Sequence, residues 1–419
     1  MKRILILSVI AAMTFCGCAT NTSNSFQPLP DSIESNLNRT GVNTNPYEYF
    51  HTPETQAPAG YRPFYISHYG RHGSRSNWES PSYGKVLNSF EKAHEAGILT
   101  EEGEKAYETV KTVINLHNHM DGRLTPLGAK EHRQIAGRMY NKYNSVFSGA
   151  KKVRAVSSVV PRCIVSMAAF TGELLSLNGN LDISWDTGEE YMKYLSSEDT
   201  RENRHEAREI IGEYRKAQVR DTMFFASHIF TDIDKAHEVV GSIDKMTRRA
   251  MEIAIICGSF ELDDSLLRCI APEDLEYISK VYSLDLYLRQ CNSVEFGDSR
   301  MAVPEMKAFM DDFISKADEA IAGGPTVADL RFGHDYHLLA IAALIGVKGI
   351  AERLTAEEAM DWPGWLYTPF AGNLQAVFYR NKAGNILVKF FINEREATLL
   401  NMEGGPYYDW QALKEAWAI

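Results

Sequence analysis

The sequence lacks the features that mark several large classes of protein. Its 44 Lys and Arg residues are outnumbered by 55 Asp and Glu residues, which gives a formal net charge of −11. This balance argues against nucleic-acid binding and provides no long-range attraction for anions. We find no His-Glu-x-x-His or similar metal-ligand cluster and no internal repeat. We therefore expect no metal and no other cofactor, and any affinity for phosphate has to come from a local cluster of cations.

Cysteine is also scarce, with six residues in a chain of 419. Cys257, Cys269 and Cys291 lie close together in the sequence, but their spacing does not match a zinc site. Disulfides form readily in exported proteins. The sequence leaves two alternatives open, a single bridge among these three cysteines or three buried thiols, and it does not fix a pairing.

The N-terminus predicts export. Residues 1–3 are basic and residues 4–15 are apolar, which is too short a run for a membrane span but typical of a secretory signal. Gly17 followed by Cys18 resembles a bacterial lipoprotein cleavage site, with Cys18 as the lipidated residue; simple secretion is the alternative. We interpret residues 1–18 as a lipoprotein signal peptide and residues 19–47, rich in Asn, Ser, Thr and Pro, as a flexible tether.

Strands and helices alternate along much of the remaining chain. The pattern predicts strands near residues 61–66, 152–157, 181–185, 327–332, 374–380 and 386–392, with helices near 81–95, 101–117, 125–143, 161–177, 336–345 and 410–417. This alternation predicts an α/β core, residues 48–185 and 326–419, with a mostly parallel central sheet flanked by helices. Strand signals vanish between residues 186 and 325, which predicts a large helical insertion that forms a cap.

One loop carries the strongest chemical signal. The segment Arg71-His72-Gly73-Ser74-Arg75 follows directly after the first predicted strand. A neutral imidazole is able to attack phosphorus and leave again, and arginine matches phosphate oxygens with two parallel hydrogen bonds. Glycine lets the backbone come close to a ligand. The combination predicts phosphoryl transfer through a phosphohistidine; a turn with two solvated arginines is the alternative.

Two further segments follow predicted strands in the same way. Arg162 lies in the first turn of the helix after strand 152–157, and a helix N-terminus with an arginine is a good seat for phosphate. His334 and Asp335 lie at the junction of strand 327–332 and the next helix. Because open α/β sheets place ligand sites at the carboxyl ends of their strands, we expect all three segments to meet.

These segments resemble the histidine phosphatase superfamily, in its acid-phosphatase and phytase branch, whose motifs are Arg-His-Gly-x-Arg and a later His-Asp. The resemblance covers the chain from about residue 60 to the end. It implies that His72 is the nucleophile that becomes phosphorylated and that Asp335 is the proton donor to the leaving alcohol. It also implies that the phosphoryl group is bound by Arg71, Arg75, Arg162 and His334. Three arginines and a histidine are suited to offset the charge on the transferring oxygens.

A finer resemblance is to the multiple inositol polyphosphate phosphatases, carried by residues 330–334, 370–375 and 388–395. The departure is Asp335, because that subgroup usually has Ala-Glu after the histidine. This leaves the proton-donor role intact and puts the substrate in doubt. Arg331 is a candidate for substrate binding, although it would equally pair with a carboxylate. Arg395 is a second candidate, with a structural role as the alternative.

We therefore expect an exported phosphomonoesterase, lipid-anchored to the envelope of a bacterium on the periplasmic or outer side. Its partners would be a small phosphorylated substrate, best matched by an inositol polyphosphate such as phytate, and the membrane through the anchor. A sugar phosphatase or a broad acid phosphatase is the alternative of the same class. A non-catalytic phosphate-binding lipoprotein, or one that scaffolds a surface complex, is the alternative of another class. The oligomeric state and the pH optimum are left open.

Overall fold

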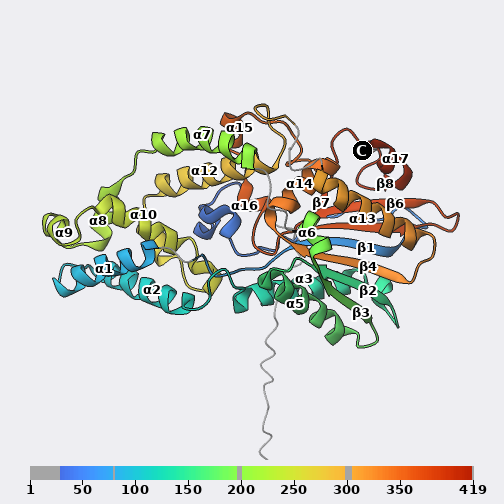
Figure 1. The fold of residues 1–419 in the computed structure, drawn as a ribbon, viewed down its shortest axis with the longest axis horizontal. Helices are drawn as coiled ribbons and strands as arrows, with labels where there is room; N and C mark the ends of the chain where they lie inside the picture. The colour runs from blue at the N-terminus through green and yellow to red at the C-terminus, as the bar shows by residue number, and fades with distance from the viewer. Residues whose placement is uncertain (1–28, 79–80, 196–200, 298–303, 418–419) are drawn as a thin grey trace, which may run out of the picture.

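The computed structural model describes residues 29–78, 81–195, 201–297 and 304–417. The predicted signal peptide and Cys18 lie outside these residues. Figure 1 shows an elongated molecule, with a sheet and its covering helices at one end and a group of helices at the other. No helix within the described ranges is both long enough and apolar enough to cross a membrane.

A single mixed sheet forms the centre of the larger end. Its strand order is β3-β2-β4-β1-β5-β6-β7, with β8 paired to β6. Neighbouring strands are parallel from β3 to β1 and antiparallel from β1 onward. The predicted mostly parallel sheet thus describes the first half, and the C-terminal hairpin extends it with antiparallel strands. The strands are β1 (Arg62–Arg71), β2 (Lys152–Ser157), β3 (Asp182–Thr187), β4 (Thr326–Gly333), β5 (Asn373–Arg380), β6 (Ile386–Ile392), β7 (Arg395–Ala397) and β8 (Tyr408–Asp409).

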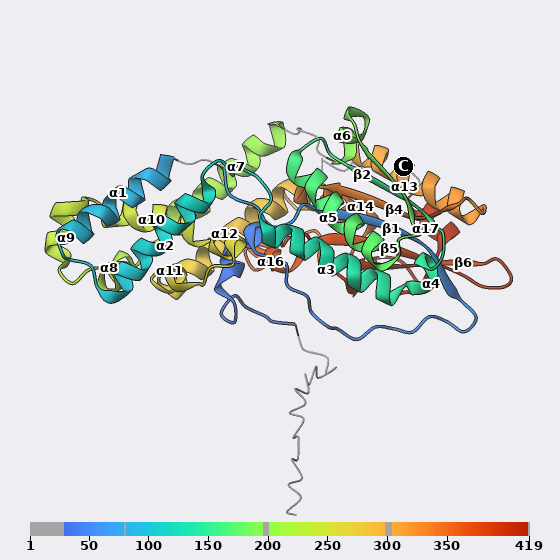
Figure 2. The ribbon, with the colours of Figure 1, turned by 90° about the horizontal axis from the view of Figure 1, so that it is seen from below.

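Helices cover both faces of this sheet (Figures 1 and 2). One face packs on α3 (Pro126–Lys142), α4 (Asn144–Phe147) and α5 (Pro161–Leu177). The other packs on α6 (Glu189–Leu195), α13 (Pro304–Ile321), α14 (Asp335–Ile345) and α17 (Trp410–Ala416). Strand β1 supplies both cores by alternation: Tyr65 and Tyr69 face α13 and α14, whereas Ile66 faces the α3–α5 side. The α/β class predicted from the sequence is confirmed.

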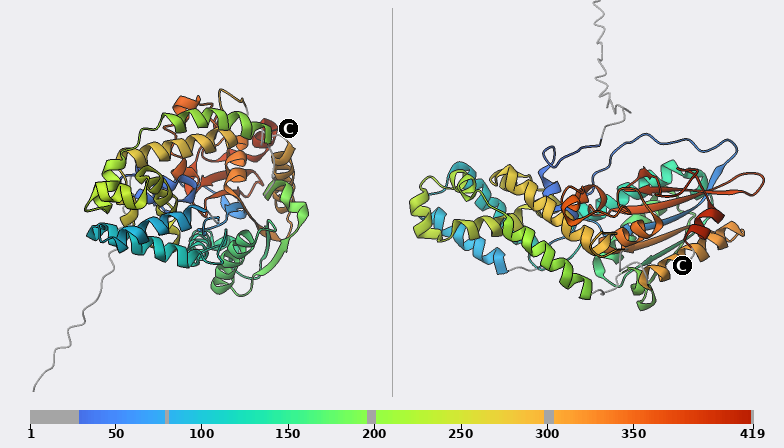
Figure 3. Two further views of the ribbon diagram at one scale, coloured as in Figure 1. Left: turned by 60° about the vertical axis from the view of Figure 1, so that its left-hand side comes forward. Right: turned by 90° about the horizontal axis from the view of Figure 1, so that it is seen from above.

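The smaller end is a helical lobe with its own apolar core (Figure 3). Its helices are α1 (Pro81–Glu95), α2 (Glu101–His117), α8 (Thr222–Ile229), α9 (Ile233–Val240), α10 (Ile243–Ala254) and α11 (Ser265–Arg268), with the 3₁₀ helix η2 (Cys257–Phe260). Helices α7 (Arg201–Ala217) and α12 (Pro272–Gln290) lie side by side between the lobe and the sheet, next to the short helices α15 (Ala356–Ala359) and α16 (Gly364–Tyr367).

The lobe differs from the predicted insertion at both ends. Helices α1 and α2, which we had assigned to the core, bury their apolar side chains against α8 and α10. Helix α13, which we had assigned to the cap, packs on β1 and β4. The reason is that a helix packs on whichever apolar surface its row of apolar side chains can cover. The distance along the sequence between the helix and the strands does not decide which surface this is.

The predicted tether is also too long. Residues Leu37–Thr44 form a 3₁₀ helix, η1, whose Arg39, Thr40 and Val42 are buried. Arg39 is held by Glu48, with Arg39 Nη2 2.6 Å from a carboxylate oxygen. Composition suggested a flexible segment, but these contacts fix it against α12 and α16. The described part of the tether therefore belongs to the folded protein.

The disulfide alternative is wrong for the described cysteines. Cys163, Cys257, Cys269 and Cys291 are all free and buried. Cys257 and Cys269 belong to the core of the helical lobe, whereas Cys291 belongs to the core beside the sheet. The Cys257 thiol donates to the carbonyl of Ile253, four residues earlier in the chain, at 3.4 Å. The second alternative, buried thiols, is the one observed.

Candidate active site

The three predicted segments meet at the carboxyl ends of β1, β2 and β4. Arg71 on β1 pairs with Gly333 on β4, and Ser157 on β2 pairs with Phe332 on β4. The residues that follow each strand therefore emerge at one edge of the sheet. The His72 and His334 rings lie edge to face with centroids 5.5 Å apart, and both side chains are buried. The structure thus brings the three predicted segments together at this edge.

Close packing under the first loop explains its glycine. A side chain at Gly73 would place its Cβ 2.4 Å from the Gly128 carbonyl oxygen at the start of α3, so only glycine fits. The Gly73 N–H donates to Ser166 Oγ on α5 at 3.1 Å. The loop is fixed further by buried Glu131 on α3, which accepts from the Ser74 N–H and the Ser74 hydroxyl, both at 2.7 Å. Two helices thus hold the loop that carries His72.

The tautomer of His72 follows from one hydrogen bond. Its Nδ1 lies 2.9 Å from the Gly73 carbonyl oxygen, which is only able to accept, so Nδ1 carries the proton. Nε2 is then the nitrogen with a free lone pair. Burial lowers the pKa of the His72 imidazole well below its usual range, and the charges of Arg71 and Arg162 lower it further. His72 is therefore neutral, as a nucleophile has to be.

The three predicted phosphate-binding arginines surround His72 and retain unused donors. Among the described residues, the buried Nε atoms of Arg71, Arg75 and Arg162 have no hydrogen-bond partner. Buried donors without partners are costly, and three in one place indicate an anionic ligand. Burial, followed by the charges of Arg162 and Arg71, lowers the pKa of Arg75 to about 10. An anion between the three arginines would offset this mutual repulsion.

His334 begins helix α14 and faces Arg162. Its Nδ1 lies 3.4 Å from Arg162 Nη2, which is only able to donate, so Nδ1 accepts. Its Nε2 faces the Cys163 thiol at 3.7 Å. Burial and the charge of Arg162 lower the pKa of His334 well below its usual range, while the neighbouring Asp335 carboxylate acts in the opposite direction. His334 is therefore a neutral ring, and an anion beside it would raise its pKa.

Asp335 is the single carboxylate paired with this arginine group among the described residues. Its Oδ2 lies 3.2 Å from Arg71 Nη2 and accepts from Asn43 Nδ2 at 2.8 Å. Burial raises the pKa of this carboxyl, but Arg71, Asn43 and His334 outweigh burial and lower the pKa to about 2. Asp335 is therefore an ionised carboxylate. It could donate a proton only after a ligand has replaced it as the partner of Arg71.

Three contributors were missed by the sequence analysis. Asn43 comes from η1, a segment with no recognisable motif. Phe370 lies beneath the arginines, with its ring centroid 4.6 Å from the Arg71 guanidinium carbon. Trp78, half exposed at the mouth of the site, lies 5.5 Å from Arg75 and 5.3 Å from Arg162 by the same measure. Two of them had a usable signal: Trp78 is an aromatic residue three positions beyond the first motif, and Phe370 lies in the segment 370–375 that carries the finer resemblance.

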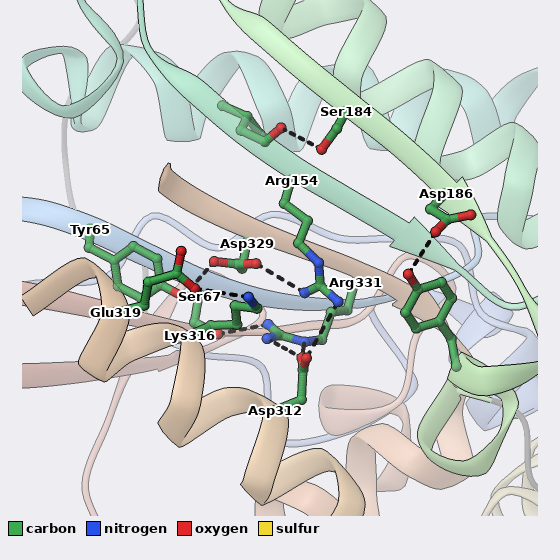
Figure 4. A network of polar contacts seen from close by, with 12 residues as sticks. Tyr65, Ser67, Arg154, Ser184, Asp186, Asp312, Lys316, Glu319, Asp329 and Arg331 are labelled. Atoms are coloured by element: carbon green, nitrogen blue, oxygen red, sulfur yellow. Dashed lines mark hydrogen bonds and ion pairs between the residues drawn. The ribbon is translucent and has the colours of Figure 1, made fainter. Parts of the chain in front are cut away.

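Two predicted substrate-binding residues lie elsewhere. Arg331 points to the α13 face of the sheet, where its Nη2 is 2.6 Å from Asp312, beside the pair of Arg154 and Asp329 (Figure 4). The carboxylate alternative is thus the correct one for Arg331. Arg395 on β7 donates to the Leu366 carbonyl at 2.9 Å and lines a different pocket. Arg331 lies on the α13 face of β4, and β7, which carries Arg395, is separated from β1 by β5 and β6.

Comparison with solved structures identifies the fold. A multiple inositol polyphosphate phosphatase from Bifidobacterium longum, in its apo form, matches with a TM-score of 0.71 and 18% sequence identity, over 91% of this chain and 98% of the other. The same protein in complex with phosphate matches with a TM-score of 0.69 and 18% identity, over 91% and 97%. The phytase from D. castellii matches with a TM-score of 0.66 and 12% identity, over 91% and 85%.

The chain has the histidine acid phosphatase fold. No protein-family model matches the sequence, and no curated protein matches it either. The similarity to these solved structures confirms the resemblance that the sequence shows in three short motifs. Within the described ranges, no group of three or more His, Cys, Asp or Glu side chains is placed to hold a metal ion.

Proposed function

We propose that this protein hydrolyses phosphate monoesters through a phosphohistidine on His72. The observation that carries the proposal is the neutral His72 with a free Nε2, enclosed by three arginines whose Nε donors have no partner. A non-catalytic phosphate-binding protein would need the arginines but not the nucleophile. The solved structures of the same fold are named as phosphatases and phytases, which supports the same class of reaction.

In the first step, Nε2 of His72 forms a bond to phosphorus while the bond from phosphorus to the ester oxygen breaks. Arg71, Arg75 and Arg162 offset the charge on the remaining phosphoryl oxygens. The bound dianion raises the pKa of His334, which then takes a proton from solvent and donates a further hydrogen bond from Nδ1. The proton of Asp335 passes to the leaving alkoxide. General acids typically accelerate such steps by about 10²–10⁴-fold.

In the second step, water attacks phosphorus and the bond to His72 breaks. The Asp335 carboxylate takes a proton from that water, which restores its acid form. The first step needs Asp335 protonated, although its pKa beside Arg71 and Asn43 is about 2. A phosphoryl dianion that takes over Arg71 and lies beside the carboxylate raises this pKa. The rate is therefore expected to fall as pH rises through the pKa of Asp335 in the substrate complex.

For the substrate we propose an inositol polyphosphate. The support is the fold shared with a multiple inositol polyphosphate phosphatase, one form of which was solved in complex with inositol hexasulfate. The second candidate is a sugar phosphate or a broad range of monoesters. It is favoured by the C-terminal turn of α7, where Lys216 pairs with Glu213 and Arg215 with Asp285. These two cations add little free positive charge for a polyphosphate.

Phosphate release from phytate, glucose 1-phosphate and p-nitrophenyl phosphate tests both points. We expect release that resists EDTA and disappears in His72→Ala. A preference for phytate supports the inositol polyphosphate assignment, and similar rates on all three support the broader one. No release from any of them between pH 3 and pH 8 contradicts the phosphatase proposal.

We also propose that the chain is exported and anchored by a lipid on Cys18. The support is the basic and apolar leader followed by Gly17 and Cys18. Mass spectrometry of the N-terminal peptide from the producing bacterium is expected to show a diacylglyceryl Cys18. An unmodified mature N-terminus at another residue would favour simple secretion.

A further inference from the structure

Arg395 is an exception among the buried arginines. Arg39, Arg71, Arg331 and Arg395 are each at most 6% exposed. Within the described residues, the first three have a carboxylate oxygen within 4 Å: Glu48, Asp335 and Asp312. Arg395 has no such pair. A buried unpaired charge costs several kcal/mol, so buried cations usually have a counter-ion.

The guanidinium of Arg395 also keeps an unused donor. Nη2 donates to the Leu366 carbonyl at 2.9 Å, and the buried Nε has no partner among the described residues. The same two observations, an unpartnered Nε and few counter-charges, characterise the arginines around His72. At Arg395, however, not even one carboxylate is paired with the guanidinium.

A pocket opens at this arginine. It has a volume of about 480 Å³ and is lined by Arg395, Lys348, Tyr367 and Thr398, together with Glu352 and Glu396. Both carboxylates already have donors. Glu352 accepts from the Gly349 N–H at 2.7 Å, and Glu396 accepts from Lys389 Nζ at 2.7 Å and from the Thr55 N–H at 2.7 Å. Exposed Lys348 on the rim adds a second cation.

This pocket is separate from the candidate active site. None of the residues that surround His72 lines it. The segment 366–372 lies between the two: the Leu366 carbonyl accepts from Arg395, and the Thr368 carbonyl accepts from Arg71 Nη1 at 2.7 Å. A ligand at Arg395 is therefore too remote to be the phosphoryl group that reacts with His72.

We propose that the pocket at Arg395 is a second, non-catalytic binding site for a phosphate group. The forked donors of arginine match a tetrahedral oxyanion, with Lys348 as a point charge at the rim. The volume exceeds that of phosphate alone, so the pocket also accommodates a phosphate carried on a small organic molecule. This proposal does not depend on the reaction at His72.

Equilibrium dialysis of the purified protein with radiolabelled inorganic phosphate tests the site at low ionic strength. We expect two bound phosphates per chain, one lost in Arg395→Met and the other lost in Arg162→Met. Arg268→Met is the control, because it removes an exposed arginine that is paired with Asp264. Competition by glucose 1-phosphate distinguishes free phosphate from a phosphorylated metabolite as the preferred occupant.

A second variant guards against misfolding of Arg395→Met. Lys348→Met changes only an exposed side chain and is expected to weaken the second site several-fold without lowering the melting temperature. Selenate soaked into crystals should give an anomalous peak beside Arg395 that is absent from Arg395→Met. If Arg395→Met folds, phosphate binding that is unchanged in both Arg395→Met and Lys348→Met overturns the proposal. If Arg395→Met does not fold, the proposal is overturned by unchanged phosphate binding in Lys348→Met together with the absence of a selenate peak beside Arg395. The proposal is also overturned if the wild-type chain binds only one phosphate and that phosphate is lost in Arg162→Met.

Discussion

Two groups of arginines lie on or just beyond strands β1, β2 and β4 and differ in charge balance. On the α13 face, Arg154 is 3.0 Å from Asp329, and Arg331 is 2.6 Å from Asp312, so two cations meet two anions. At the carboxyl edge, Arg71 pairs with Asp335, and among the described residues Arg75 and Arg162 have no carboxylate of their own. The first group is electrically complete and fastens α13 to the sheet. The second carries excess positive charge and unused donors, which is what a phosphate-binding site requires.

The pKa shifts of the two groups run in opposite directions. Burial lowers the pKa of Arg331, but the carboxylates of Asp312 and Asp329 more than offset burial, and the net shift is upward. For Arg75, burial and the neighbouring cations act together, and the pKa falls to about 10. Charge balance around an arginine, rather than its burial, thus distinguishes a structural arginine from a ligand-binding one. The following variants test this distinction.

The largest effect is expected from Asp335→Asn. The amide has no proton to give to an alkoxide, so kcat/KM on phytate should fall by about 10²–10⁴-fold. The loss of kcat/KM on p-nitrophenyl phosphate, which reports the steps up to phosphorylation of His72, should be much smaller, because its leaving group needs little help from an acid. Its kcat should still fall, because Asp335 also takes the proton from water in the second step. Steady-state kinetics on both substrates give the comparison. Equal losses of kcat/KM on the two would show that Asp335 acts through Arg71 or through the fold and not as the proton donor.

Arg162→Met should damage activity and spare stability. Loss of one positively charged donor at the transferring phosphoryl group is expected to lower kcat/KM by about 10²–10³-fold. The melting temperature should stay the same or rise, because repulsion with Arg71 and Arg75 is relieved. Thermal unfolding and kinetics on the same preparation test this, and a large loss of stability would contradict the binding role.

Arg331→Met should do the opposite. Removing one partner of a buried ion pair typically costs about 3–5 kcal/mol, because Asp312 is left beside an apolar side chain. The folded fraction should keep kcat/KM within about threefold of wild type, since Arg331 does not reach the site. Urea unfolding of Arg331→Met and of the double variant Arg331→Met/Asp312→Leu gives the test. Recovery of stability in the double variant is expected.

Buried histidines next to both groups should make stability depend on pH. Burial lowers the pKa values of His68, His132 and His337 to about 3. The unfolded chain binds these protons near pH 6.5 and the folded chain does not, so stability is complete above pH 6.5 and is lost as pH falls toward 3. Each of the three histidines changes the free energy of unfolding by up to about 1.4 kcal/mol per pH unit in that window.

Urea unfolding between pH 7 and pH 4 measures this slope. His132→Asn should reduce it, whereas the exposed His94→Gln should leave it unchanged and serves as the control. Stability that does not change between pH 7 and pH 4 would show that these rings are protonated in the folded protein.

The smallest effect is expected from Trp78→Ala. The indole covers Arg75 and Arg162 but is half exposed, so its removal should raise KM several-fold and change kcat little. Trp78→Phe should recover most of the affinity, because an aromatic face remains. Unchanged KM in Trp78→Ala would limit the substrate contacts to the buried part of the site.

Local signals predicted most of the regular structure. Thr125 caps α3 by accepting from the Gly128 N–H, with Pro126 in the first turn, and α5 spans the residues that its periodicity predicted. The site was also predictable, because parallel strands bring their carboxyl ends together and the motifs follow β1, β2 and β4 directly. Each of these features depends on a few neighbouring residues.

The parts that the sequence did not reveal depend on distant contacts. The bond from Asn43 to Asp335 joins residues 292 positions apart, and nothing in the composition of η1 distinguishes it from a tether. The same holds for α1 and α2, whose apolar stripes fit the lobe and the sheet equally well until the packing partner is known. The partner of Arg331 could not be chosen either, because Asp312 lies on a helix that was assigned to the cap.

The central claim is that His72 itself carries the phosphoryl group. Rapid acid-free quenching during turnover, followed by mass spectrometry of the peptide that contains residues 71–75, tests it most directly. We expect a phosphate on His72 that forms before the steady state, decays when substrate is exhausted, and accumulates in Asp335→Asn with p-nitrophenyl phosphate. Rapid turnover with an unmodified His72 at every time point, together with inversion of configuration at phosphorus when a chiral phosphate ester is hydrolysed, would contradict this claim.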